Sequence, residues 1–168
     1  MDKSDILTLF EYNYWANALV LSAAEKVSAE QFTAPFQLSH GSLKGALVHT
    51  LGTEIVWRLR IQEAISPAAL PAESEFASLE SLRSRWQKEE QAMRAYLDSL
   101  TDAALDQRIQ YKTTKGLPHE NVLWHLLAHV VNHGTQFRSE AAVALTVYGH
   151  SPGDLDLLKF FHQRQQCK

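Results

Sequence analysis

Apolar residues recur at helical spacing along four separate stretches of the chain, and these stretches define the predicted fold. The longest is residues 119–149, which contains no internal proline and would form a helix about 45 Å long. The other three are residues 4–26, 43–64 and 79–100. Ser42 and Ser78 directly precede two of them, where a serine hydroxyl can accept a hydrogen bond from a free backbone N–H of the first turn. Ser4 or Asp5 can cap the first helix in the same way. The pattern predicts an all-α protein with residues 119–149 as its main pillar.

The segments between these helices are longer than tight turns. Residues 27–41 and 65–77 contain proline or glycine, and their length favours crossover connections over the short turns of a simple antiparallel bundle. Residues 101–118 alternate weakly between apolar and polar side chains and contain a Lys-Gly pair, a pattern typical of a short hairpin. The tail at 155–162 is apolar enough to dock on the bundle or on a partner chain. We therefore predict one four-helix-bundle domain over residues 1–168, with short extra helical or hairpin segments.

Composition and charge exclude several classes of protein. The formal net charge is −3, and no basic run alternates with aromatic residues, which argues against nucleic-acid binding. No apolar run approaches the length of about 18 residues that a membrane-spanning helix needs. The first residues carry acids and lack the apolar core of a secretion signal. Cys167 is the single cysteine and cannot form an internal disulfide. We expect a cytoplasmic protein that binds neither nucleic acid nor membrane.

Histidine spacing in the longest predicted helix indicates a candidate metal site. His125, His129 and His133 lie four residues apart, which places successive imidazoles on nearly the same helix face, as two metal ligands from one helix require. At about 100° per residue, His133 lies about 40° from Phe137 of the apolar stripe and is expected to be at least partly inward, whereas His129 lies about 80° from Phe137, at the stripe's margin. His125 is expected to face solvent. Such histidines are more often surface residues than ligands, and the inward tilt of His133 is what favours a site.

The second predicted helix carries one further candidate, His49. It shares a helix face with side chains small enough to leave room for a ligand: Gly45, Ala46, Thr53 and Val56. A lone helical histidine is usually a core or boundary residue, so the histidine alone does not establish a site. Four residues separate Glu54 from Arg58 on the same helix, and this spacing predicts a solvated or boundary ion pair.

Three stretches in this order resemble the DinB/YfiT-like family of metalloenzymes: YNYWAN at 12–17, SLKGALVHTLGTEIVW at 42–57, and LLAHVVNHGTQFRSEAAVAL at 126–145 followed by YGHSPGDLDL. The resemblance covers nearly the whole chain. It implies a four-helix bundle with up-down-down-up topology, often dimeric, that holds nickel or zinc with three histidines. His49 matches the ligand of the second helix, and His133 matches the first ligand of the fourth.

The chain departs from this family pattern at Phe137, which stands where the second histidine of the fourth helix is expected. Phenylalanine cannot bind a metal, and three outcomes stay open. In the first, the metal site is lost and Phe137 fills the former cavity. In the second, His129 completes a triad with His49 and His133, or Glu140 supplies the missing ligand. In the third, two histidines hold a divalent metal weakly, together with water.

The resemblance implies a divalent-metal-dependent enzyme of the thiol S-transferase or hydrolase type. Its ligand would be a small molecule, such as a low-molecular-weight thiol, and its assembly a homodimer. A metal ion with an open position lowers the pKa of a bound water or thiol. The resemblance also suggests that residues of the first helix line the pocket: Tyr12, Asn13, Trp15 and Asn17. The alternative is a metal-free bundle that binds a small molecule, or acts through dimerisation, without catalysis.

Overall fold

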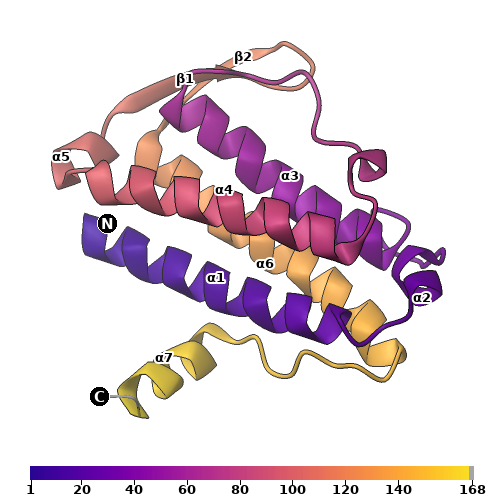
Figure 1. Ribbon diagram of the computed structural model, residues 1–168. Helices are drawn as coiled ribbons and strands as arrows, with labels where there is room; N and C mark the ends of the chain where they lie inside the picture. The colour runs from indigo at the N-terminus through magenta and orange to yellow at the C-terminus, as the bar shows by residue number, and fades with distance from the viewer. Residues whose placement is uncertain (167–168) are drawn as a thin grey trace.

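The computed structural model describes residues 1–166 and is a bundle of four long helices (Figure 1). These helices are α1 (Lys3–Ala24), α3 (Leu43–Gln62), α4 (Leu79–Ser99) and α6 (Leu123–Val147). Helices α1 and α6 run in one direction along the bundle, and α3 and α4 run in the other (Figure 1). The predicted all-α four-helix bundle with up-down-down-up topology is therefore confirmed.

The parallel course of α3 and α4 requires the chain to return along the bundle between them. Residues 63–78 make this crossover and contain a short 3-10 helix, η1 (Glu73–Glu75). Helix α6 packs against both α1 and α3, and these are the most extensive contacts between helices of the bundle. The long apolar stretch thus forms the longest helix of the bundle, as its length predicted.

A two-stranded hairpin covers one end of α3. Strand β1 (Arg108–Lys112) pairs antiparallel with β2 (Pro118–Val122). A hairpin therefore precedes the long helix as predicted, but its second strand lies almost wholly beyond the predicted residues 101–118. The long helix begins four residues later than predicted, because the backbone of residues 119–122 pairs with β1 instead. Two short helices, α2 (Ala29–Thr33) and α5 (Asp102–Leu105), complete the connections.

Helix capping follows the sequence at two of the three predicted positions. The Ser42 hydroxyl accepts a hydrogen bond from the backbone N–H of Gly45 at 2.8 Å, and Ser78 caps α4 in the same way. Helix α1 begins at Lys3, one residue before its predicted start. Asp2 is its cap and accepts from the backbone N–H of Asp5 at 2.9 Å, so neither Ser4 nor Asp5 serves as the cap.

Glu54 is buried within a polar cluster that crosses the centre of the bundle. Its carboxylate accepts hydrogen bonds from the Nδ2 atoms of Asn13 and Asn17, at 2.8 and 3.1 Å, and from the Trp86 indole at 2.8 Å. The buried Arg138 guanidinium donates to the Oδ1 atoms of the same two asparagines. The two amides therefore bridge one buried carboxylate and one buried guanidinium.

The predicted ion pair between Glu54 and Arg58 is wrong. Arg58 instead donates from Nε to Glu89 at 2.5 Å and from Nη1 to Glu63 at 2.7 Å. Helical spacing gave no sign that Glu54 faces α1 and Trp86 of α4, whereas Arg58 faces Glu89. The same polar cluster uses Asn13 and Asn17 as core bridges, so their amides serve the packing of the bundle.

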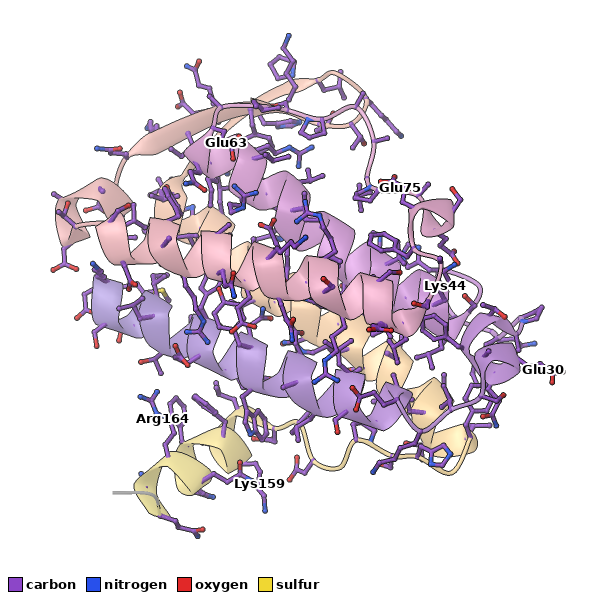
Figure 2. The ribbon with its side chains drawn as sticks, viewed as in Figure 1. Glu30, Lys44, Glu63, Glu75, Lys159 and Arg164 are labelled. Carbon is purple, nitrogen blue, oxygen red and sulfur yellow. The ribbon has the colours of Figure 1, made fainter. Side chains whose placement is uncertain are left out.

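The C-terminal segment folds back along α1 (Figure 1). Helix α7 (Leu157–Gln166) buries Phe160, whose ring lies edge-on to Tyr12 at 5.9 Å, and the Tyr12 hydroxyl donates to the Leu155 carbonyl at 3.0 Å. The exposed Lys159 side chain points away from the bundle (Figure 2), whereas the Arg164 guanidinium lies over the Phe160 ring, with Cζ 5.4 Å from its centroid. Cys167 lies outside the described residues. Within residues 1–166, each helix is too short or too polar to cross a membrane.

Candidate functional site

Two histidines from different helices meet where α3 packs against α6. The Nε2 atoms of His49 and His133 lie 3.2 Å apart, and both side chains are half-buried. Two neutral imidazoles can share one hydrogen bond at this distance. The same distance suits two ligands of one metal ion, since two nitrogens at 2.0–2.1 Å from a tetrahedral zinc lie about 3.3 Å apart. The pair therefore supplies two correctly spaced donors.

Phe137 closes one side of this pair. Its ring centroid lies 4.4 Å from that of His49 and 4.5 Å from that of His133, and its side chain is buried. A phenyl ring thus packs beside the two imidazoles, one turn after His133. The apolar contact stabilises the pair's position and offers no third donor.

A third imidazole, from His40, lies against one face of the His49 ring. The two rings are stacked with centroids 3.7 Å apart and an interplanar angle of 18°. The lone pair of an imidazole nitrogen lies in the plane of its ring. Because the two stacked rings lie in nearly parallel planes, their lone pairs cannot both point at one ion. His40 thus adds an aromatic contact to the pair in this arrangement. Sequence reasoning missed it, because His40 precedes α3 in a loop whose path no periodic pattern reveals.

The loop that carries His40 is fixed at two points. The Glu140 carboxylate accepts hydrogen bonds from the Ser39 backbone N–H at 3.0 Å and from its hydroxyl at 2.5 Å. On the other side, the His40 carbonyl oxygen packs so closely on Gly45 that a Cβ there would overlap it. Glu140, one of the candidate replacement ligands, is therefore engaged in holding this loop.

His129, the other candidate replacement, lies one turn before His133. Its ring centroid is 5.7 Å from that of His133, and it packs edge-on against Trp57 at 5.1 Å. His125 is exposed, as expected. Within residues 1–166, no three His, Cys, Asp or Glu side chains are arranged so that they could hold a metal ion. The fold thus brings together His49 and His133, while His129 faces a neighbouring cavity.

The paired imidazoles are neutral at pH 7. Burial, together with the neighbouring His40, lowers the pKa of His49 to about 4, although Glu140 acts in the opposite direction. Burial also lowers the pKa of His133 to about 4, with further contributions from His49, His129 and His40. Metal ions bind the neutral form of histidine, so neither ring needs to lose a proton first.

A cavity of about 290 Å³ adjoins the pair. Trp57 and Arg60 of α3 line it, together with the hairpin and the α6 residues His129 and His133. The pKa of His129 is lowered by burial and by the Arg60 charge, so this imidazole is also neutral at pH 7. The cavity therefore joins one member of the pair to a buried arginine.

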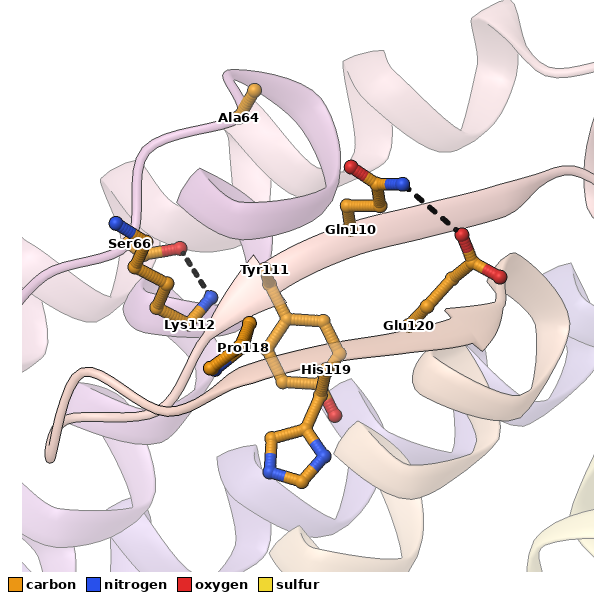
Figure 3. Close-up of a pocket in the computed structure, with 8 residues that line it drawn as sticks. All are labelled: Ala64, Ser66, Gln110, Tyr111, Lys112, Pro118, His119 and Glu120. Atoms are coloured by element: carbon orange, nitrogen blue, oxygen red, sulfur yellow. Dashed lines mark hydrogen bonds between the residues drawn. The ribbon is translucent and has the colours of Figure 1, made fainter.

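A larger cavity, of about 720 Å³, lies against the hairpin (Figure 3). It shares Tyr111 and His119 with the smaller cavity, and these two rings stack with centroids 5.9 Å apart. The backbone N–H of Lys112 donates to the Ser66 hydroxyl at 3.0 Å, which ties the hairpin to the crossover (Figure 3). Neither His49 nor its partner lines this larger cavity, so the smaller one is the better candidate site.

Comparisons with known proteins agree with this architecture. A family model described as the DinB family matches residues 1–167. Among solved structures, YfiT from Bacillus subtilis is similar, with a TM-score of 0.66 and 16% sequence identity over 90% of this chain and 91% of that one. YfiT is described as a probable metal-dependent hydrolase with an unusual four-helix bundle topology. At this identity the likeness establishes the fold alone. No curated protein matches the chain.

Proposed function

Because the chain belongs to the DinB family, we propose that it is a divalent-metal-dependent enzyme of the hydrolase or thiol S-transferase type. His49 and His133 would hold the ion. The observation that carries this proposal is the 3.2 Å distance between their Nε2 atoms beside a cavity. The description of YfiT as a metal-dependent hydrolase supports the hydrolase type, and imidazole ligands suit nickel or zinc.

The donor set fits a loosely held ion. Catalytic zinc sites commonly have three protein ligands, and Phe137 leaves two here. We therefore expect an affinity below that of a three-histidine site, with more coordination positions left for water or substrate. When bound, the ion would supply Lewis-acid chemistry and lower the pKa of a coordinated water or thiol.

The chain's own residues would bind and orient the substrate. His129 is neutral at pH 7 and lines the cavity one turn from His133, so its imidazole can accept a proton from a group bound there. Trp57 packs edge-on against His129 and is a positioning residue for that ring. Tyr111 of the hairpin lines the same cavity and would limit the access of water to a bound molecule.

Phe137 specifically favours a second candidate function. A phenyl ring beside the two histidines suits a metal-free bundle, in which His49 and His133 share a hydrogen bond and the cavity binds a small molecule without catalysis. A low-molecular-weight thiol as ligand and a homodimer as assembly remain predictions for either candidate. Sedimentation velocity would test the dimer.

Calorimetric titration with zinc and nickel separates the two candidates. The untagged wild-type chain should bind about one ion, and His49→Ala and His133→Ala should each lose that binding. His125→Ala is the matched control, because His125 lies on α6, as His133 does, but is exposed. Wild-type protein that binds no ion, or His49→Ala protein that binds as well as wild type, would favour the metal-free function.

A further inference from the structure

Arg60 is a buried cation without a counter-ion in the described part of the chain. The residue is 7% exposed, and its Nε finds no hydrogen-bond partner within residues 1–166. No ion pair of the described residues includes it. By contrast, the buried Arg58 pairs with Glu89, and the buried Arg138 donates to two asparagines. Arg60 therefore differs from the arginines that hold the bundle together.

Aromatic packing holds the Arg60 guanidinium in place. Its Cζ atom lies 4.7 Å from the centroid of the Trp57 ring and 5.5 Å from that of Tyr111. Contact with aromatic faces offsets part of the cost of burying the charge, but a ring face accepts no hydrogen bond in the guanidinium plane, and the buried Nε has no acceptor among residues 1–166. Burial lowers the pKa of Arg60, and Tyr111 partly opposes this effect. The arrangement leaves strong hydrogen-bond donors unused at a cavity wall.

The cavity that Arg60 lines has the features of a site for a small anion. Among residues 1–166, no carboxylate lines it, whereas Thr113, Thr114 and His119 contribute polar atoms from the hairpin side. Its volume of about 290 Å³ is at the lower end for ligand pockets, so the occupant is small. One uncompensated positive charge matches a monoanion, and the planar guanidinium fork matches a carboxylate in particular.

We propose that Arg60 binds the carboxylate of a small organic acid in this cavity. Trp57, Val56 and Leu70 provide apolar surface for the rest of the molecule. His133 lines the same cavity, so the other end of the acid would lie near the paired histidines. The inference rests on the proposed function only where it calls this acid a substrate; carboxylate binding itself requires no metal.

Binding measured on metal-free protein tests the proposal. The probes are sodium butyrate and sodium phenylacetate, and their neutral analogues are butyramide and phenylacetamide. Binding is measured by calorimetry or NMR in buffer that contains EDTA, at constant ionic strength. We expect saturable binding of the carboxylates, and binding weaker by about tenfold or more for the amides, because a charge-assisted bidentate contact is lost. Equal binding of an acid and its amide would overturn the proposal, and so would the absence of saturable carboxylate binding. Tighter binding of inorganic phosphate than of either acid would overturn the assignment to a carboxylate.

Variants of Arg60 locate the contact. Arg60→Gln should weaken carboxylate binding by about tenfold or more, and Arg60→Lys, which keeps the charge but loses the fork, should weaken it less. Arg164→Gln is the matched control, because it removes the same charge from an exposed position on α7. Carboxylate binding unchanged in both Arg60 variants would overturn the proposal. Arg60→Lys keeps the test valid if Arg60→Gln fails to fold.

Zinc titration of the same variants separates this proposal from the proposed function. Arg60→Lys should bind zinc as tightly as wild type, since Arg60 is not one of the proposed ligands. If wild type binds carboxylates but no metal, the anion site stands and the metal-dependent activity fails. If wild type binds metal but shows no difference between acids and amides, the metal site stands and the anion site fails.

Discussion

The ring of Phe137 lies 4.4 Å from the ring of His49, on a side of the histidine pair where a further metal ligand could stand. Position 137 follows His133 by one helical turn, so its side chain points toward the same site. The phenyl ring fills the space beside the two imidazoles and offers no donor atom. If the proposed metal site is correct, the residue at position 137 sets how many histidines can bind the ion.

Phe137→His should add a third imidazole donor beside His49 and His133. We expect zinc affinity to rise by about tenfold or more, since even about 1.4 kcal/mol from an added ligand gives a factor of ten. The metal-free variant should be less stable than wild type, because a polar ring replaces a buried apolar one. Zinc titration and urea unfolding measure the two effects. Phe137→Leu is the control, and a gain in affinity there as large as with histidine would contradict this explanation.

The histidine pair predicts a dependence of stability on pH in the metal-free protein. Folding lowers the pKa of His49 and His133 to about 4, below the ordinary value of about 6.5, so the unfolded chain binds more protons between these values. Stability is thus fully present above about pH 6.5 and falls as the pH drops toward about 4. Urea unfolding across this range should show the fall.

A double variant identifies the groups responsible for that dependence. His49→Gln/His133→Gln should have a shallower loss of stability between about pH 6.5 and 4, because the two titrating groups are gone. His125→Gln, at the exposed position, should retain the wild-type slope. An unchanged slope in the double variant would mean that other groups cause the loss.

Gly45→Ala should destabilise the loop that carries His40. Alanine in a helix is ordinarily better than glycine by up to about 1 kcal/mol. Here the added Cβ would overlap the His40 carbonyl oxygen, which is backbone and cannot move aside without shifting the loop. Overpacking of this kind costs about 1–3 kcal/mol, so we expect a net loss of stability. Lys44→Ala is the neighbouring control and should change the free energy of unfolding by about 0.5 kcal/mol or less. A more stable Gly45→Ala protein would show that the loop is not held there.

Glu54→Ala should be among the most destabilising single changes in the bundle. It would leave the donors of Asn13, Asn17 and Trp86 without their acceptor and remove the carboxylate that balances the buried Arg138. Each buried donor left without an acceptor costs about 1–3 kcal/mol, so the three donors together predict a loss of about 3 kcal/mol or more. Urea unfolding measures this, with Glu90→Ala on α4 as a control at a partly exposed ion pair. A cost below about 1 kcal/mol would contradict a central role for the cluster.

Local sequence signals predicted the elements that depend on local rules. Helical periodicity identified α3 and α4 nearly to the residue, and Ser42 and Ser78 marked where they begin. The start of α6 was wrong by four residues, because pairing with β1 prevailed over an apolar pattern that continues through the strand. A short-range pattern indicates which secondary structures a segment can adopt. Pairing with a strand elsewhere in the chain then determines which of them it adopts.

The candidate site depended more on tertiary contacts. His49 and His133 were identified through the family resemblance together with the inward tilt of His133. His40 was missed because its place over His49 results from contacts far apart in the chain, at Glu140 and Gly45. The isolation of Arg60 could not be predicted either, since the lack of a counter-ion is a property of the packed structure.

The most direct test of the metal site is a crystal structure of the untagged protein grown with saturating zinc, analysed by anomalous scattering at the zinc edge. The account predicts one strong peak bonded to the Nε2 atoms of His49 and His133, at about 2.0–2.1 Å from each. A zinc-free pair in such crystals, with the two imidazoles still in direct contact, would contradict it.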